Sequence, residues 1–421
     1  MKQTLAFVLL AFSATAFAQE PEQWSRFRGP NGQGISTVTG LPTQWSATEN
    51  VAWKTPIPGA GWSSPVVWSD HIFLTTATDG GKECRVIAVD RKSGQILWNT
   101  VVFTQELKRK HPRNSEATPT PVTDGQRVYA VFAGGGFVAL DFKGDIVWKN
   151  TELDFYSHHG FGASPMLYGD LMITAINPST TEKDEPRIGW QLPWDKSYLL
   201  ALDKNTGKER WRGLRGLSRI SHSAPVVIQV NGKDQILSAA GDVVQGFEPA
   251  TGERIWSVMN SGEPCVPTPA IGEGMVFMAT SPSSPIIGVK TDGKGDVTET
   301  HVVWKQERNS PIVSSFLYVK PCLYSANDRG TFAAHDAQTG EILWEHRLEG
   351  RPDSSAIYAD GKIYVTTHIG TTTVFKPNTD PKKPAEVVAV NETGKTVQAT
   401  LAIAGKQFFL RTDKELWCIG K

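Results

Sequence analysis

Four side chains that could bind a polar ligand stand directly before pairs of small residues. They are an indole, two carboxylates and an imidazole, contributed by Trp62, Glu116, His222 and Asp353. Arg351 stands two residues before Asp353 and adds a guanidinium. Such a mixture of aromatic, acidic and basic groups could bind a small polar molecule by stacking and hydrogen bonding. The opposing interpretation is that these residues belong to ordinary polar surface loops.

A second group of aromatic and cationic side chains is suited to contact with a partner, and it consists of His158, His159, Trp190, Trp194 and Arg219. The two tryptophans lie in a charged insertion, residues 177–196. Aromatic rings in a long loop are typical of partner contacts, although the same rings could fold back onto the domain. Adjacent histidines diverge in an extended segment and no third ligand is evident, so we predict no metal site.

Several kinds of chemistry lack their usual sequence motif. There is no GxSxG, HExxH, phosphate loop or haem-attachment CxxCH. The 43 basic and 43 acidic residues cancel, and this balance argues against a nucleic-acid partner. The chain has four cysteines, none in a CxxC motif, and the three possible pairings stay open. We expect mainly small buried cysteines with at most one disulfide.

The elements that must position these residues come from a repeat. Its phrase is Asp, two or three residues, Gly, three residues and Trp, as in Asp90 to Trp98 and Asp203 to Trp211. Asp can bond nearby backbone and Gly can adopt a left-handed conformation, so the phrase predicts a tight turn followed by a strand. The tryptophans assigned to this repeat are Trp53, Trp98, Trp148, Trp211, Trp256, Trp304 and Trp344.

Each phrase follows small residues and short alternating strands, which together make four strands per unit. A unit of this kind, repeated around the chain, predicts a propeller blade. We count eight units, at 62–98, 117–148, 163–211, 223–256, 267–304, 314–344, 354–391 and 399–421. The last unit ends after three strands, and we expect residues 50–54 to supply the fourth. The prediction is an all-β, eight-bladed β-propeller of four-stranded antiparallel blades, closed by an N-terminal strand.

The ring geometry explains the small pairs. Innermost strands of a propeller converge on the axis, so their first residues must be small. The residue before each pair is then expected at one mouth of the central channel, which gathers Trp62, Glu116, His222 and Asp353. Arg351 and Arg113 are expected slightly further out.

The phrase resembles the tryptophan-docking repeat of pyrroloquinoline-quinone-type β-propellers, over about 55–421. The opening Trp24–Ser36 also resembles the leader of secreted proteins of this class. The resemblance implies that the repeat tryptophans are structural and stack between neighbouring blades.

Two functions are compatible with this resemblance. The first is an exported, non-catalytic binding or scaffold module for an envelope protein or a small polar ligand. At fold level it resembles the propeller subunits of outer-membrane β-barrel assembly machineries, which are lipid-anchored, whereas the residue directly after Ala18 here is Gln19 and not a cysteine. The alternative is a dehydrogenase of alcohols or sugars that uses pyrroloquinoline quinone and calcium. That family uses a stacking Trp, carboxylate and amide calcium ligands and often adjacent cysteines, and we can map no such set.

The N-terminus carries a targeting signal. Residues 1–18 combine Lys2, an apolar run and a small-x-small end at Ala18, as a secretory signal peptide does. We therefore expect cleavage near Ala18 and a periplasmic or extracellular protein without a transmembrane span. The expected organisation is a signal peptide at 1–18, a leader at 19–49 and one propeller domain at 50–421.

Overall fold

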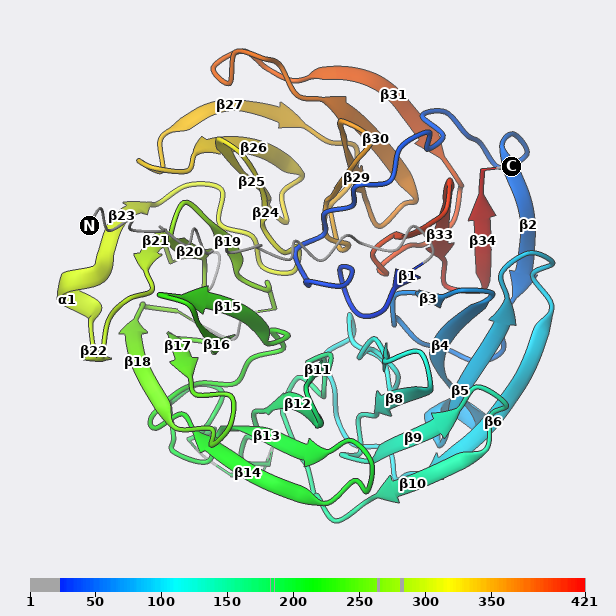
Figure 1. Ribbon diagram of the computed structural model, residues 1–421, viewed down its shortest axis with the longest axis horizontal. Coiled ribbons are helices and arrows are strands. Elements are labelled where there is room, and N and C mark those ends of the chain that lie inside the picture. Colours follow the sequence, from blue (N-terminus) through cyan, green and yellow to red (C-terminus); the bar gives the residue numbers. More distant parts are fainter. Residues whose placement is uncertain (1–22, 182, 185, 263–265, 281–283, 421) are drawn as a thin grey trace, which may run out of the picture.

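The computed structural model describes residues 23–181, 183–184, 186–262, 266–280 and 284–420. The signal peptide predicted at 1–18, its cleavage site and Cys265 lie outside these residues. Eight antiparallel sheets follow one another around a central axis as the blades of a propeller (Figure 1). The predicted all-β, eight-bladed fold is confirmed.

Each blade has four strands, written here from the inner to the outer edge. Blade 1 contains β3 (Val66–Trp68), β4 (His71–Thr78), β5 (Glu83–Asp90) and β6 (Ile96–Thr104), and blade 2 contains β7 (Val122–Thr123), β8 (Arg127–Val131), β9 (Phe137–Asp141) and β10 (Ile146–Asn150). Blade 3 contains β11 (Met166–Tyr168), β12 (Leu171–Ile176), β13 (Tyr198–Asp203) and β14 (Glu209–Leu214), and blade 4 contains β15 (Val226–Val230), β16 (Lys233–Ala239), β17 (Val243–Phe247) and β18 (Arg254–Met259). Blade 5 contains β19 (Ala270–Gly272), β20 (Met275–Met278), β21 (Ile286–Lys290) and β23 (Val302–Gln306), and blade 6 contains β24 (Leu317–Val319), β25 (Cys322–Ala326), β26 (Thr331–Asp336) and β27 (Ile342–Arg347). Blade 7 contains β28 (Ile357–Ala359), β29 (Lys362–Thr366), β30 (Thr371–Lys376) and β31 (Glu386–Glu392), and blade 8 contains β32 (Ala402–Ala404), β33 (Gln407–Arg411), β34 (Glu415–Ile419) and β2 (Val51–Pro56).

Four short elements complete the fold. Strand β1 (Gln23–Trp24) joins the inner edge of blade 1, and β22 (Gly295–Asp296) joins the outer edge of blade 4. Helices η1 (Asp79–Gly81) and α1 (Thr298–His301) lie in connections. Across the described ranges, neither helix has the length and apolar character that crossing a membrane requires.

Position within a blade determines the residue pattern of each strand. Middle strands such as β8 and β17 are buried at nearly every residue, because the neighbouring blades cover both of their faces. Outer strands such as β2 and β10 alternate or are largely exposed, because part of their surface faces solvent. The core is therefore a set of apolar layers between blades.

The ring closes in blade 8 with strands from both ends of the chain. The N-terminal strand β2 pairs antiparallel with β34, and Trp53 lies opposite Cys418. A buried Arg411 guanidinium adds a second link, donating hydrogen bonds to the carbonyl oxygens of Ser63 and Thr75 in blade 1. Closure by an N-terminal strand was predicted from the sequence and is confirmed.

Five repeat tryptophans contact the turn of the following blade. The indole Nε1 donates to a turn carbonyl oxygen from Trp53, Trp98, Trp148 and Trp304, at 2.8–3.1 Å. The turn glycine leaves room for the ring: a Cβ on Gly207 would lie 2.4 Å from Cε3 of Trp148. Trp211 packs against Gly252 in the same way. Large rings thus cover the seams between blades.

Two repeat tryptophans make other contacts. Trp256 donates its Nε1–H to Gln235 Oε1 within its own blade, at 2.8 Å. Strand β22 pairs with the outer strand that carries Trp256, and Gly295 lies opposite this residue. Trp344 lies against Tyr324 and Phe332, also within its own blade. The following unit has no Asp-to-Gly turn, so Trp344 has no such turn to contact.

The leader residues 23–36 close one end of the channel, and we call them the leader plug. They bond to six blades, through pairs such as Arg26 Nη2 with Pro225 O at 2.6 Å and Arg28 Nη2 with Phe316 O at 2.5 Å. In Figure 1 this blue segment crosses the centre of the ring before the chain reaches β2. Burial lowers the pKa of Arg26 to about 10 and that of Arg28 to about 9. The leader is therefore packed as part of the propeller.

The described cysteines are buried and make no disulfide. Cys84, Cys322 and Cys418 are free. Burial raises the pKa of the Cys84 and Cys418 thiols to about 12, so both stay protonated near neutral pH. These three behave as small apolar residues.

Candidate functional site

A belt of hydroxyl groups surrounds the axis just before the inner strands. In each link, a backbone N–H of one blade donates to the Ser or Thr side-chain oxygen of the next blade. Six such bonds, of 2.9–3.0 Å, run from Ser64 to Thr120, Thr120 to Ser164, Thr268 to Ser315, Ser315 to Ser355, Ser355 to Thr400 and Thr400 to Ser64. The belt is broken at Ala224, which has no hydroxyl. Most of these positions therefore use a hydroxyl group as well as a small side chain.

The belt corrects the expected position of Glu116. Blade 2 contains Thr118-Pro119-Thr120-Pro121. Glu116 falls at the mouth position only if the first Thr-Pro is aligned with the other blades, whereas the belt uses Thr120 of the second. The residue at the channel mouth is consequently Thr118. Glu116 lies off the mouth, where its Oε1 is 2.8 Å from Lys110 Nζ. A two-residue slip between identical dipeptides caused the error.

A cavity of about 460 Å³ occupies the channel mouth above the belt. Its volume lies in the range of roughly 300–1,000 Å³ typical of small-molecule sites. Each blade lines the cavity with the residue that stands two positions before its belt residue in the sequence. These residues are Trp62, Thr118, Gly162, His222, Val266, Val313, Asp353 and Gln398. Phe27 of the leader plug also lines the cavity. The plug thus closes the cavity at its inner end.

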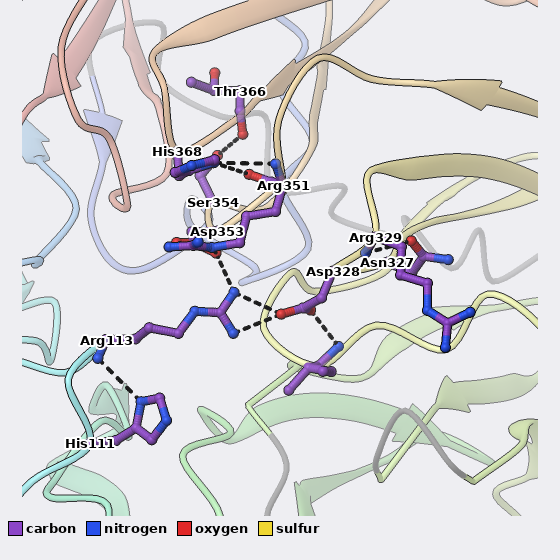
Figure 2. A network of polar contacts seen from close by, with 11 residues as sticks. His111, Arg113, Asn327, Asp328, Arg329, Arg351, Asp353, Ser354, Thr366 and His368 are labelled. Carbon is purple, nitrogen blue, oxygen red and sulfur yellow. Dashed lines mark hydrogen bonds and ion pairs between the residues drawn. The ribbon is translucent and has the colours of Figure 1, made fainter.

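An arginine spans the cavity mouth. Arg113 belongs to the connection between β6 and β7, yet both of its terminal nitrogens lie 2.7 Å from Asp328 Oδ2 of blade 6. Its Nη2 is also 2.7 Å from Asp353 Oδ1 of blade 7. Figure 2 shows Arg113 extending toward both carboxylates, with Arg351 on the other side of Asp353. We call Arg113, Asp328, Asp353 and Arg351 the mouth ion cluster.

The mouth ion cluster is neutral overall and partly buried. The Asp353 side chain is 2 % exposed, and Arg351 Nε donates to its two oxygens at 3.0 and 3.1 Å. Burial opposes the charge on Arg113, but the hydrogen bonds and charges of Asp328 and Asp353 outweigh burial and raise the Arg113 pKa. Two arginines therefore balance two carboxylates.

Histidines and Trp190 form the opposite wall. The Trp190 ring stacks on His158 with centroids 3.7 Å apart and planes at 10°. His159 lies edge-on to the same indole and 6.2 Å from His222. His111 lies 5.5 Å from His159. The insertion thus folds back so that Trp190 lines the cavity.

These histidines are uncharged near neutral pH. Burial, assisted by neighbouring cations, lowers the pKa of His158 to about 4 and that of His159 to about 3. Burial also lowers the pKa of His222 to about 4, and that of His111 is lowered as well. Among the described residues, no three His, Cys, Asp or Glu side chains are arranged to bind a metal ion.

The remaining predicted partner residues lie outside the cavity. The Trp194 backbone pairs with Ser218, with N–O distances of 3.1 and 3.0 Å, and Trp194 is not in the cavity lining. Arg219 donates its backbone N–H to Asp242 Oδ1 and its guanidinium to Gly262 O. The structure therefore brings together Trp62, His159, Trp190, His222 and Asp353, with Arg351 and His158 directly behind them.

Pyrroloquinoline quinone with calcium fits this cavity poorly. Calcium prefers several carboxylate and carbonyl oxygens. Both carboxylates of the mouth ion cluster are instead held by arginines, and Glu116 lies elsewhere beside Lys110. The four cysteines include no adjacent pair. Trp62 is suitably placed for stacking, but the donor set for the metal is missing.

Comparison with known families decides the family. A family model described as outer membrane protein assembly factor BamB matches residues 23–155, 194–314 and 296–415, most of the chain. The chain belongs to this BamB family of PQQ-type repeat propellers. The predicted resemblance to such propellers is thereby confirmed.

Solved structures agree on the fold. BamB from Moraxella catarrhalis is 15 % identical, with a TM-score of 0.59, and the match covers 88 % of this chain and 97 % of that one. A europium-containing methanol dehydrogenase is 11 % identical, with a TM-score of 0.66 and coverage of 93 % and 90 %. The computationally designed Ika8 protein is 11 % identical, with a TM-score of 0.55 and coverage of 86 % and 98 %. No curated protein matches the chain. At these identities, the likeness shows the fold alone.

Sequence reasoning missed Phe27, Thr118, His111 and Asp328. One available signal was topological: inner strands run away from the mouth and second strands return, so the turn after each second strand also reaches the mouth. Asp328 lies in such a turn, between β25 and β26. Phe27 had no comparable signal, because only the folded leader places it in the channel.

Proposed function

We propose that this member of the BamB family is an exported, non-catalytic binding module whose recognition site is the mouth cavity. The observation that carries the proposal is the chemistry of the cavity wall. Its carboxylates are paired with arginines, and its histidines are neutral and pack against Trp190 or one another. Such a site offers shape, aromatic surface and hydrogen bonds. Its described residues include no thiol, no hydroxyl that is hydrogen-bonded to a histidine or carboxylate, and no set of metal ligands.

The comparisons support a partner in the cell envelope. The matched family is described as an outer membrane protein assembly factor, and the sequence predicts export after cleavage near Ala18. Trp190 is well placed for recognition, because it lines the cavity from an insertion and is rigidly stacked on His158. Rigid aromatic residues often dominate binding energy.

A partner-capture comparison tests this role. The purified protein should retain a component of the exported fraction, and Trp190→Ala should reduce its recovery at least tenfold. Trp194→Ala is the matched control, since it removes an indole from the same insertion outside the cavity lining. Equal recovery with both variants would contradict a binding site at the mouth.

The alternative, a quinone-dependent dehydrogenase, is tested separately. Its support is the shared fold of the methanol dehydrogenase and a channel-mouth cavity containing Trp62. The purified protein is mixed with pyrroloquinoline quinone and calcium or europium, and dye reduction is followed with methanol and with glucose. We expect no turnover. Stoichiometric quinone binding with turnover would overturn the non-catalytic proposal.

A further inference from the structure

We propose that the mouth cavity binds an uncharged saccharide of one or two rings. This inference deepens the proposed function and rests on the mouth cavity being the recognition site. Four features support it: the cancelled charges, the ring of hydroxyl donors, an unpaired amide and two unpartnered aromatic rings.

The charges of the wall favour an uncharged ligand. In the mouth ion cluster two guanidinium groups balance two carboxylates, through contacts of 2.7–3.1 Å. The histidines opposite are neutral near pH 7. A charged ligand would lose its hydration without gaining a free counter-ion, and such burial is strongly unfavourable. A neutral ligand avoids this penalty.

The belt supplies hydrogen-bond donors. Its six hydroxyl oxygens each accept a backbone N–H, and all six residues line the cavity: Ser64, Thr120, Ser164, Ser315, Ser355 and Thr400. A hydroxyl also carries one proton to donate. None of these six hydroxyls donates a hydrogen bond to another of the described residues. The cavity floor is therefore ringed by donors that suit a ligand rich in oxygen.

Gln398 adds a matched donor and acceptor. Its side chain lines the cavity, and its amide makes no hydrogen bond with the described residues. A carboxamide has an oxygen that accepts and an NH₂ group that donates. Neighbouring hydroxyl groups of a sugar can use both at once. Asp353, also in the lining, has oxygen lone pairs beyond those used by the arginines.

Two aromatic rings provide an apolar surface. Trp62 on the wall and Phe27 on the floor line the cavity, and neither ring contacts another aromatic ring among the described residues. The ring faces are electron-rich. The C–H face of a pyranose carries partial positive charge and can lie against them. Stacking and hydrogen bonding together match a sugar ring.

An aromatic peptide side chain would fit this wall less well. It would cover the belt hydroxyls and Gln398 without pairing them, and burial of an unpaired polar group costs about 1–3 kcal/mol. The cavity of about 460 Å³ has room for a monosaccharide or a disaccharide. These arguments select the saccharide over the peptide.

Titration calorimetry on the full mature protein tests the inference with matched ligands. The probes are glucose, N-acetylglucosamine and maltose, then glucuronate as the charged analogue and N-acetyltryptophanamide as the peptide mimic. We expect at least one neutral sugar to bind, with glucuronate at least tenfold weaker than glucose. Trp62→Ala and Gln398→Ala should each weaken sugar binding at least tenfold, whereas Trp194→Ala should leave it unchanged.

The outcomes separate the two proposals. Binding of N-acetyltryptophanamide without any neutral sugar would overturn the saccharide assignment and preserve the mouth as a recognition site. Unchanged sugar affinity in both Trp62→Ala and Gln398→Ala would also overturn it. Absence of all probe binding, combined with partner recovery that is insensitive to Trp190→Ala, would overturn both. Thermal unfolding of each variant establishes that it is folded.

Discussion

At the scale of single residues, Arg113 joins distant parts of the ring. It comes from the connection before blade 2 and meets carboxylates of blades 6 and 7, separated from it by 215 and 240 positions in the chain. The Arg113 side chain is 28 % exposed and that of Asp353 only 2 %. Pairs at this depth contribute more than surface pairs, because water screens them less.

Replacement of Arg113 should lower stability. In Arg113→Ala, Asp328 loses two contacts of 2.7 Å and Asp353 keeps only Arg351. We expect the free energy of unfolding, measured in urea, to fall by about 1–3 kcal/mol. Arg212→Ala is the control, since the Arg212–Glu209 pair is about half exposed and should contribute less than about 1 kcal/mol. Equal losses would contradict a special role for Arg113.

The histidines around the cavity should make stability depend on pH. Their pKa values are lowered to about 3–4 in the fold, below the ordinary value of about 6.5. Between these pKa values the unfolded chain binds more protons than the folded one. The free energy of unfolding therefore has its full value above about pH 6.5 and declines as the pH falls toward 4. The limit is about 1.4 kcal/mol per pH unit for each histidine. Urea unfolding at pH 7 to 5 should show this decline, and His222→Asn should reduce its slope. Parallel slopes would contradict the prediction.

At the scale of elements, two kinds of contact between blades recur around the ring at different radii. Near the axis, a lead-in hydroxyl accepts a backbone N–H from the preceding blade. At the rim, a tryptophan contacts the turn of the next blade. Both kinds of contact connect neighbours only, so the ring is stabilised by a series of similar seams.

Two threonines of the lead-in segments allow a matched test of the belt. Thr400 Oγ1 accepts the Ser355 N–H at 3.0 Å, whereas the buried Thr268 Oγ1 has no hydrogen-bond partner among the described residues. Valine has nearly the same shape without the hydroxyl. Thr400→Val should lower the free energy of unfolding by about 1–3 kcal/mol, because a buried N–H loses its acceptor. Thr268→Val should be neutral or stabilising, and a reversed order would contradict the belt.

Two left-handed glycines allow a matched test of tryptophan docking. Gly207 and Gly169 have φ of 71° and 53°, so alanine strains both by about 1–2 kcal/mol. Only at Gly207 would the new Cβ meet an indole, 2.4 Å from Trp148, since nothing lies within 4 Å at Gly169. Gly207→Ala should therefore lose a further ~1–3 kcal/mol relative to Gly169→Ala in urea unfolding. Equal losses would contradict the docking contact.

At the scale of the whole molecule, the N-terminal segment has two roles in the closed ring. The leader plug bonds to six blades at one end of the channel, and β2 then supplies the outer strand of blade 8. The leader plug closes the inner end of the mouth cavity, and β2 covers the edge of β34 that would otherwise be open. The ring, the cavity floor and the closure therefore depend on one segment.

Truncation should separate this segment from the rest of the ring. A chain beginning at residue 57 lacks the plug and β2, so it should lose cooperative thermal unfolding and associate through the exposed β34 edge. A chain beginning at residue 23 keeps both and should unfold as the mature protein does. Size-exclusion chromatography and calorimetry measure these outcomes. A monomeric, cooperatively unfolding chain from residue 57 would contradict the role of the closure.

Residues close in sequence determine the repeat, and the sequence alone therefore predicted the blades and their closure. The Asp-to-Gly turn before Trp98 or Trp211 depends on local backbone preferences, and strand alternation depends on neighbouring side chains. The same local view failed where Thr118-Pro119 and Thr120-Pro121 looked alike, and it placed Glu116 at the mouth. Only the belt between blades distinguished these two dipeptides.

The tertiary structure alone decided what surrounds the cavity. Arg113 meets Asp328 and Asp353, Trp190 folds onto His158, and Phe27 closes the floor. These contacts join loops of different blades, and their meeting depends on the curvature accumulated around the closed ring. No pattern among residues that are close in sequence encodes this accumulated curvature. The sequence thus determined an eight-bladed ring with most of its mouth positions, and the folded ring decided that the mouth cavity is neutral, lined by aromatic rings and closed at its inner end.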